Sequence, residues 1–460
     1  MSTSVDLDES EQVVCCQRFS FGYGSDPPLY TWLQMVFFSV FGQSVLGLSL
    51  LKNLLLLSIY CLTYVTVRLM QRSTCVAIAA TLSLLYLPEV AWESQRDLTH
   101  SILASCLSLA TLYCFLRVHK GRQTGWYVLL GLCAGAGLIT KFNYALWLVG
   151  IALGAISLRH LRPMILDKRM LLALALCLIV FLPNALWMLE HKDLALLTSS
   201  KFHINQSVGW FKVTALGLKN LCSAIINFCV PLILIYLLLF WKAPAQKTTP
   251  PDDSLSYLSM LFRSWLIIGG ILVAVVVFAR ATGFKDRWFE PILIALPAAA
   301  AVFVQNRLTQ RRLAFMTALS LTIMTAVLII MPGRLLAAER LHREEPLTRP
   351  YAQLAAQIHP LVPAGALVIC NTRLLAGNLR LGLPDVLVIP PELTRLMKTD
   401  EKHCFLVWDA TRDEDLPWVL RQWQNQYGFK EMGAGQRRFF SATYKYHKSK
   451  QYRLGVVQLF

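Results

Sequence analysis

Charged side chains are scarce in this 460-residue chain, at 15% of all residues, whereas a typical soluble domain has about 25%. Hydrophobic residues make up 55%, and the mean hydropathy is +0.50. A soluble fold would have to bury more apolar surface than its core can hold. The composition is instead typical of an α-helical protein that crosses a membrane several times.

Acidic residues are the rarer charge, 27 against 44 basic residues, which gives a formal net charge of +17. A nucleic-acid partner is one explanation for such an excess of cations. Here, however, most of the excess lies in short loops between apolar runs, where it reports membrane orientation. We therefore expect the membrane, and no nucleic acid, as the partner of these cations.

Several cofactor signatures are missing. No P-loop and no dinucleotide-binding glycine motif occurs, so direct use of a nucleotide is not indicated. The 12 cysteines show no metal-ligand spacing, and most lie in or beside apolar segments, where cysteine behaves as a small hydrophobic residue. The sequence predicts no cofactor and no metal site.

Ten apolar runs are candidates to cross a hydrocarbon core of roughly 30 Å. Two of them are short and separated only by Lys141–Asn143, which indicates a tight helical hairpin. Ten crossings place both chain ends on the same side of the membrane. The runs are 45–70, 74–90, 101–118, 125–140, 144–158, 170–188, 222–241, 264–280, 289–305 and 313–331.

Lys and Arg cluster in alternate loops, and such loops face the cytoplasm in membrane proteins. Clusters lie near residues 68–72, 117–122, 159–169, 242–263 and 307–312. With ten crossings they all fall on one face, so the amino-terminal segment and the tail face outward.

The character of the chain changes after residue 331. Short β-type runs at 366–370, 386–389, 404–408 and 454–459 alternate with helical stretches at 351–358 and 416–427. This pattern predicts a small soluble α/β domain. The chain is thus predicted to comprise an extracytoplasmic catalytic loop with a juxtamembrane helix (1–44), a multi-span transmembrane domain (45–331) and an extracytoplasmic α/β domain (332–460).

The first thirty residues carry the densest motif. The acidic pair Asp8-Glu9 precedes a Gly22-Tyr23 turn and the sequence Pro27-Pro-Leu-Tyr30. A Gly/Pro turn followed by an aromatic, half-apolar helix start at 27–41 indicates a segment that lies on a bilayer surface.

The order and spacing of these motifs resemble the first extracytoplasmic loop of the GT-C glycosyltransferases, in the bacterial branch of aminoarabinose, galacturonosyl and protein-mannosyl transferases (families 39 and 83). The resemblance extends more weakly to about residue 330. It implies a bacterial inner-membrane enzyme that moves a sugar from a polyprenyl phosphate to an acceptor hydroxyl, with inversion, on the periplasmic side. The acceptor class stays open: lipid A or lipopolysaccharide, another glycan, or a protein.

The family places a spanning helix before this loop, whereas the present chain begins almost at the acidic pair. We therefore expect either a start site further upstream or the loss of that first helix. Residues 1–12 have neither the basic nor the apolar region of a signal peptide.

Sugar transfer requires a base for the acceptor's proton and cations for the departing phosphate. The resemblance assigns the base to Asp8, positioning to Glu9, and an acidic role across the cavity to Asp97. The alternatives are a solvated acidic terminus for Asp8 and Glu9, and a helix N-cap for Asp97. Further candidates in these loops are Tyr23, Glu93, Arg96 and His100.

Lys141 matches a family lysine that the resemblance implies contacts the lipid phosphate. Arg280, Lys285 and Arg287 lie at the basic and aromatic entry to a late apolar run, and the planar guanidinium of an arginine suits phosphate. The alternative for Lys141 is a side chain that only snorkels to the membrane surface. The alternative for Arg287 is an interfacial pair with Asp286.

Two further functional readings remain open. A transporter or flippase for a lipid-linked anion would use the same cations, but it predicts charges in the middle of spans and broken helices. The charges of this chain lie mostly at the ends of the apolar runs, and the tail is folded, which favours the enzyme. A scaffold without activity is the third reading.

Overall fold

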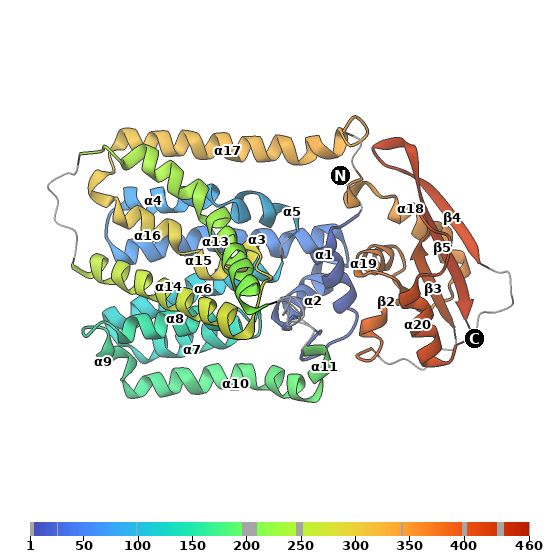
Figure 1. The fold of residues 1–460 in the computed structure, drawn as a ribbon, viewed down its shortest axis with the longest axis horizontal. Helices are drawn as coiled ribbons and strands as arrows, with labels where there is room; N and C mark the ends of the chain where they lie inside the picture. The colour runs from blue at the N-terminus through green and yellow to red at the C-terminus, as the bar shows by residue number, and fades with distance from the viewer. Residues whose placement is uncertain are drawn as a thin grey trace. The chain divides into compact units, whose positions relative to one another are not determined.

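The structure is a computed structural model that describes residues 4–24, 26–97, 99–195, 209–244, 252–341, 344–397, 403–429 and 437–459. Its elements fall into two compact units (Figure 1). One unit is helical and comprises Gly24–Tyr30 and Lys52–Val327. The other combines the amino-terminal segment up to Tyr23, Thr31–Leu51 and the chain from Leu328 onward.

Six helices are long and apolar enough to cross a membrane, among the residues that the structure describes. They are α3 (Val45–Met70), α6 (His100–Gly121), α10 (Lys168–Glu190), α13 (Trp210–Phe240), α14 (Asp252–Ala279) and α17 (Gln310–Leu336). A seventh candidate is a pair bent by 72°, Thr74–Tyr86 and Glu89–Arg96. It contains α4 (Thr74–Leu82), the 3-10 helix η1 (Ser83–Tyr86), the π-helix η2 (Glu89–Glu93) and α5 (Ser94–Arg96).

The structure therefore confirms a helical, multi-span membrane protein but has fewer full-length spans than the ten runs predicted. Two of the other runs form the short helices α7 (Thr124–Leu138) and α8 (Tyr144–Ile156), and the third is divided into α15 (Glu290–Leu293) and α16 (Leu296–Phe303). The 15 residues of α7 rise by only about 22 Å at 1.5 Å per residue. The short α7–α8 hairpin was predicted from the sequence, whereas the break between α15 and α16 was not, because the intervening Ile294 and Ala295 are themselves apolar or small.

Contacts in the helical unit bring together segments that the sequence analysis placed on one face. Arg169 donates a hydrogen bond to the backbone oxygen of Arg122, and Arg263 Nη1 donates to the Ser157 oxygen at 3.1 Å. Arg307 Nη1 donates to the Phe240 oxygen at 3.0 Å. All these residues lie in or beside loops predicted to be cytoplasmic. The remaining short helices of this unit are α9 (Arg162–Ile165), α11 (Lys192–Ala195), η3 (Asp286–Trp288) and η4 (Gln305–Arg307).

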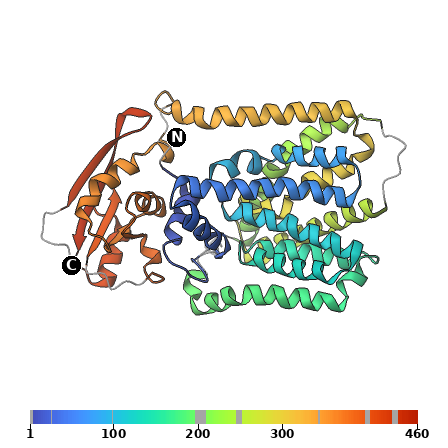
Figure 2. The same ribbon diagram turned by 180° about the vertical axis from the view of Figure 1, so that it is seen from behind.

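The tail forms the predicted α/β domain around a five-stranded mixed sheet of order β2-β1-β3-β5-β4. Strand β1 runs parallel to β2 and β3, whereas β5 is antiparallel to both β3 and β4. Figure 2 shows β4 and β5 as the reddest ribbons, with β4 at the sheet edge. The strands are β1 (Leu367–Cys370), β2 (Leu387–Ile389), β3 (Cys404–Asp409), β4 (Arg438–Tyr444) and β5 (His447–Leu459).

Strand β4 was missed by the sequence analysis, and β5 is longer than the 454–459 run. Both strands are rich in exposed polar residues, because half of β4 and the first part of β5 face solvent. Such strands lack the apolar run that marks a buried strand.

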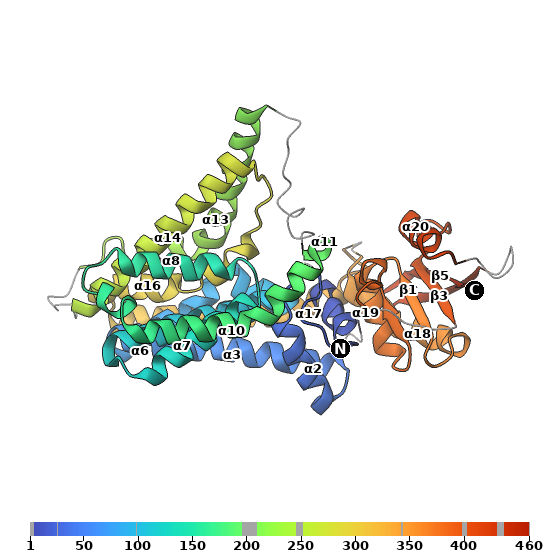
Figure 3. The same cartoon turned by 90° about the horizontal axis from the view of Figure 1, so that it is seen from below.

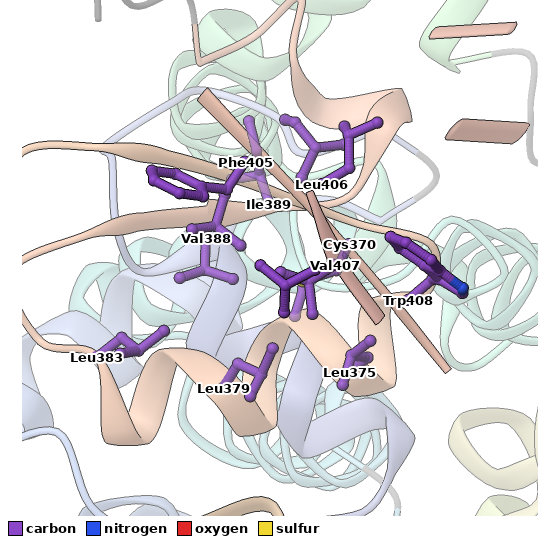
Figure 4. Close-up of a cluster of buried hydrophobic side chains, with 14 of the residues drawn as sticks. Cys370, Leu375, Leu379, Leu383, Val388, Ile389, Phe405, Leu406, Val407 and Trp408 are labelled. Atoms are coloured by element: carbon purple, nitrogen blue, oxygen red, sulfur yellow. The ribbon is translucent and has the colours of Figure 1, made fainter. Parts of the chain in front are cut away.

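The core of this domain lies between the sheet and the helices that follow its parallel strands. Leu375, Leu379 and Leu383, in or just after α19 (Arg373–Gly382), point toward Val388 and Val407 of the sheet (Figure 4). The spacing of four residues places these leucines on one face of the helix. The other helices are α18 (Tyr351–Ile358) and α20 (Trp418–Tyr427), with 3-10 turns at Pro346–Thr348, His359–Leu361 and Pro391–Leu393.

The amino-terminal segment packs into this same unit through α1 (Leu7–Cys15). Gly377 of α19 allows the approach, because a Cβ atom there would lie 2.2 Å from the Ser10 backbone oxygen. Arg373 of α19 pairs with Glu11 of α1 and, at 2.9 Å, with Glu392. The acidic pair was expected in a loop, whereas the structure places it in the first turn of a helix. The juxtamembrane helix expected at 27–41 is present as α2 (Leu29–Phe41).

Candidate functional site

Lys141 lies in the turn between α7 and α8 and lines a cavity of about 350 Å³. Its Nζ atom donates to Ser101 Oγ at 2.6 Å and to the Arg287 backbone oxygen at 3.3 Å. The rest of the cavity wall is largely apolar and includes Leu146 of α8 and Val275 of α14. The site therefore combines a cation with a largely apolar, lipid-like surface.

Three chain segments meet at this ammonium group: the α7–α8 turn, the start of α6 and the segment around η3. Asn143 Nδ2 also donates to the backbone oxygen of Trp288, which ties the turn to the same segment. The sequence analysis placed all three segments on the outward face. Their contact explains why the lysine is not simply snorkelling, since its ammonium is held by defined oxygen atoms.

The four predicted phosphate-binding cations do not share one cavity. Lys285 and Arg287 line a neighbouring cavity of about 300 Å³, and only the backbone oxygen of Arg287 contacts Lys141. Arg280 follows the end of α14 with φ of 54°, a left-handed conformation that is uncommon for a residue other than glycine. The segment from Arg280 to Arg287 is therefore sharply turned.

Glu290 is a charged residue that the sequence analysis did not single out. It is fully buried at the start of α15, and its electrostatic neighbours are Lys141 and Ser105. Ser101 and Ser105 lie one turn apart on α6, and Ser101 Oγ accepts the hydrogen bond from Lys141. A carboxylate inside an apolar run was the available signal, because such residues are rarely without a role.

The second outward segment contains Glu93, Arg96, Asp97 and His100. Glu93 and Arg96 form a half-exposed ion pair at 3.8 Å, whereas the Asp97 side chain is buried and only 8% exposed. Helix α6 begins at His100 with Thr99 as its N-cap, so the alternative of an N-cap role for Asp97 is wrong. His100 packs against Tyr30 with ring centroids 5.4 Å apart, and Ser101 beside it contacts Lys141.

Asp8 and Glu9 lie in the first turn of α1, where carboxylates are stabilised by the helix dipole. Both side chains are half-buried, and α1 is packed on α19. The alternative of a solvated acidic tail is therefore wrong. These two residues belong to a different compact unit from Lys141 and Asp97.

Tyr23 has a structural role in the turn between α1 and α2. Its hydroxyl donates to the Arg18 oxygen at 2.8 Å and accepts from the Ser20 nitrogen at 2.9 Å. The side chain is buried, and this burial raises the pKa of the Tyr23 phenol. The residue closes the turn that joins α1 to α2, which explains its place in the Gly-Tyr motif.

No group of three or more His, Cys, Asp or Glu side chains is arranged to hold a metal ion within the described part of the chain. The ionisable side chains that line the Lys141 cavity are Asp26 and Lys141, whereas Lys285, Asp286 and Arg287 line the neighbouring cavity. The arrangement can bind an amphiphile with an anionic head through Lys141 and the apolar wall.

Comparison with known proteins identifies the family. The chain is 32% identical over 432 residues to the lipopolysaccharide core galacturonosyltransferase RgtB of Rhizobium johnstonii, covering 92% of this chain and 86% of that protein. The chain belongs to the GT-C glycosyltransferases. The enzyme is also 30% identical over 396 residues to RgtA of the same organism, a second lipopolysaccharide core galacturonosyltransferase, covering 85% of this chain and 78% of RgtA.

Two further comparisons agree with this membership. Residues 25–187 of this glycosyltransferase match the dolichyl-phosphate-mannose-protein mannosyltransferase family. The crystal structure of ArnT from Cupriavidus metallidurans bound to undecaprenyl phosphate has the same fold, with a TM-score of 0.58 at 14% identity over 99% of this chain and 94% of ArnT. The apo form of ArnT gives a TM-score of 0.56 at 16% identity, covering 100% of this chain and 94% of ArnT. The predicted family and enzyme class are confirmed.

Proposed function

We propose that this glycosyltransferase moves a sugar from a polyprenyl phosphate to a hydroxyl of a lipopolysaccharide core, as the activities named for RgtA and RgtB suggest. The observation that supports the donor class most directly is the cavity at Lys141. A polyprenyl phosphate has an anionic head and an apolar tail, and the cavity is lined by a lysine and by a largely apolar wall. A lysine beside an apolar wall is stabilised when it meets an anion.

Lys141 is assigned as the main phosphate contact, because it alone of the four predicted cations lines the apolar cavity. Its hydrogen bonds to Ser101 and to the Arg287 oxygen fix the direction of the ammonium. Arg280, Lys285 and Arg287 add positive charge along the turned segment that borders the cavity. This charge favours departure of the lipid phosphate when the bond to the sugar breaks.

The proposed reaction is a single displacement. Asp8 accepts the proton of the acceptor hydroxyl while the hydroxyl oxygen bonds to the anomeric carbon. The bond from that carbon to the phosphate oxygen breaks, and the polyprenyl phosphate leaves with the bonding electrons. Glu9 positions Asp8, and Asp97 orients the acceptor. An attack opposite the leaving group inverts the anomeric centre.

The active face is proposed to be periplasmic, in the bacterial inner membrane. The distribution of Lys and Arg supports this, since the basic loops meet at the opposite ends of the helices from Lys141. The amino-terminal segment and the α/β tail are proposed to lie on the periplasmic side with it.

The test is the binding of bare undecaprenyl phosphate to the purified, detergent-solubilised enzyme. Lys141→Ala is expected to weaken binding by about 10- to 100-fold, since a charge-assisted hydrogen bond is worth about 1.5–3 kcal/mol. Lys120→Ala removes a charge from an exposed residue in a predicted cytoplasmic loop and serves as the matched control. Equal affinity of the wild type and Lys141→Ala, in a folded preparation, would show that the phosphate binds elsewhere.

A further inference from the structure

A third cavity, of about 550 Å³, lies between α6, α7, α8 and α10. Its wall is largely apolar and includes the buried side chains of Phe115 and Ile151. The charged residues that line it are Asp167 and Lys168, at the start of α10. Among the described residues, it has no lining residue in common with the Lys141 cavity. It is therefore a separate apolar space with two charged residues in its lining.

Part of the cavity wall lies at the surface of the helical unit. Leu166, Leu171 and Leu174 line the cavity and are 79%, 69% and 54% exposed. Helix α10 is apolar enough to cross a membrane, and only 22% of its most apolar 18-residue stretch is buried. Figures 1 and 3 show α10 running alongside α7. Exposed leucines on such a helix face hydrocarbon, so the cavity opens toward the bilayer.

The helices around the cavity are held by close packing. A Cβ atom at Gly131 of α7 would overlap the backbone of Ala173 of α10, so glycine is required for this approach. In the same way, a Cβ atom at Gly154 of α8 would lie 2.9 Å from the Met260 oxygen of α14. Helices α7 and α10 are thus fixed as one pair, and α8 and α14 as another. The space that α7 and α10 leave beside α8 is part of the fold and not a result of loose packing.

The chain around the charged lining residues is basic. Residues 159–169 contain four Lys or Arg residues and one carboxylate. That carboxylate, Asp167, accepts hydrogen bonds from Arg169 Nε at 2.9 Å and from Arg169 Nη2 at 2.7 Å, so a guanidinium already balances its charge. Lys168 beside it is exposed, and the amino terminus of α10 adds partial positive charge. An anionic group is therefore favoured where the apolar wall meets Lys168.

We propose that this cavity binds an acyl chain of an anionic phospholipid, with the phosphate of the lipid at Lys168. The apolar wall favours a lipid over free phosphate, because only a lipid fills it with a hydrocarbon chain. The excess of cations favours an anionic head group over a zwitterionic one. Basic pockets between membrane-spanning helices hold anionic lipid head groups in this way.

The site is distinct from the one proposed for polyprenyl phosphate. Lys141 precedes α8, whereas Lys168 follows it. The 13 residues of α8 rise by about 20 Å. A lipid phosphate at Lys168 therefore lies far from the donor phosphate at Lys141. The inference goes beyond the proposed reaction, because it adds a second lipid in the leaflet that meets the basic loops.

The experiment measures where a photoreactive lipid attaches to the purified, detergent-solubilised, full-length enzyme. The probe is phosphatidylglycerol with a diazirine in its acyl chain, and mass spectrometry quantifies the label on residues 165–177. Lys168→Gln is expected to reduce labelling about fivefold at a subsaturating lipid concentration, the factor that corresponds to about 1 kcal/mol per cation at an anionic lipid surface. Lys242→Gln removes an exposed cation from another predicted cytoplasmic loop and should leave labelling unchanged.

Filling the cavity tests its apolar part. Ala152→Leu enlarges a side chain of the wall and should reduce labelling by phosphatidylglycerol and by phosphatidylcholine with the same chain. Ala175→Leu adds the same volume at an exposed position of α10 outside the cavity and should have no effect. Thermal unfolding checks that each variant is folded.

Three results would overturn the proposal. The first is wild-type labelling of Lys168→Gln, a surface change whose result stands whether or not Ala152→Leu folds. The second is wild-type labelling of a folded Ala152→Leu variant. The third is loss of the label when bare undecaprenyl phosphate is added in excess, because a polyprenyl chain would then be the occupant of the cavity.

Discussion

Asn378 of α19 holds the backbone of Val5, although 373 residues separate them: Asn378 Oδ1 accepts from Val5 N at 2.9 Å, and Nδ2 donates to Val5 O at 3.0 Å. The same amide donates to Ser10 Oγ at 3.0 Å. The segment that carries the acidic pair is thus part of the folded tail domain. The structure of the tail and the position of Asp8 are therefore linked.

Removing that amide should loosen α1. Asn378→Ala leaves the buried N–H and C=O groups of Val5 without partners, which costs about 1–3 kcal/mol for each group. We expect a lower midpoint of thermal unfolding and faster hydrogen exchange at residues 5–15. Asn425→Ala, at an exposed position of α20, is the control and should leave both unchanged. Unaltered exchange in Asn378→Ala would show that α1 is held by its apolar face alone.

Gly377 should tolerate no side chain. In Gly377→Ala the new methyl would lie 2.2 Å from the Ser10 oxygen, a backbone atom that cannot rotate away. The two helices must separate, so we expect destabilisation and loss of transferase activity together. Gly269→Ala is the matched helical control, since nothing lies within 4 Å of its added Cβ. It should stabilise slightly, by about 0.5–1 kcal/mol. Full activity of Gly377→Ala would show that catalysis does not depend on the packing of α1 against α19.

Substitutions in the acidic pair Asp8-Glu9 should lower the rate of sugar transfer without lowering the stability of the protein. Asp8→Asn keeps the size of the side chain but cannot accept the acceptor's proton, so turnover should fall by about 10²- to 10⁴-fold. Undecaprenyl phosphate binding and thermal stability should stay at wild-type values. Glu9→Gln should lose less, and Asp97→Asn should fall between the two. Wild-type turnover by Asp8→Asn would remove it as the base and make Asp97 the next residue to test.

Lys141 and Glu290 should be coupled in stability. Glu290 is fully buried and the half-buried Lys141 is its cationic neighbour, so removing the cation leaves the carboxylate less compensated and should destabilise the protein. We therefore expect Lys141→Met to destabilise the enzyme, and the double variant Lys141→Met/Glu290→Gln to recover much of the loss without recovering activity. Thermal unfolding of the four proteins in this double-mutant cycle measures the coupling. Additive effects would show that the two side chains do not interact.

Orientation can be tested with a reporter that is active only outside the cytoplasm. Fusion after residue 335 should be active, and fusion near residue 165 should be silent. The α7–α8 hairpin returns to its own side, so it does not affect this outcome, whereas α15 and α16 must together cross the membrane. Arg307, Arg311 and Arg312 directly after them favour that crossing. The reverse reporter pattern would place Lys141 and Arg287 on the cytoplasmic face.

The sequence by itself determined the membrane class, the α/β tail and the family. Each of these depends on local composition or on a short motif: the apolar runs, the alternation after residue 331, and the Asp8-Glu9 pair with its Gly-Tyr turn. A local pattern can be recognised in the sequence because it reflects interactions between residues that are near neighbours in the chain. The break between α15 and α16 could not be predicted, since Ile294 and Ala295 continue the hydropathy of the two helices.

Only the tertiary structure showed that α1 is a helix docked on α19, that Glu290 is buried beside Lys141, and that Lys285 and Arg287 face a cavity of their own. These facts depend on contacts between residues hundreds of positions apart, such as Val5 with Asn378, or between α6, the α7–α8 turn and η3. No spacing along the chain encodes them. The charge of each side chain is set by the sequence, but the group that it meets is set by how the helices pack.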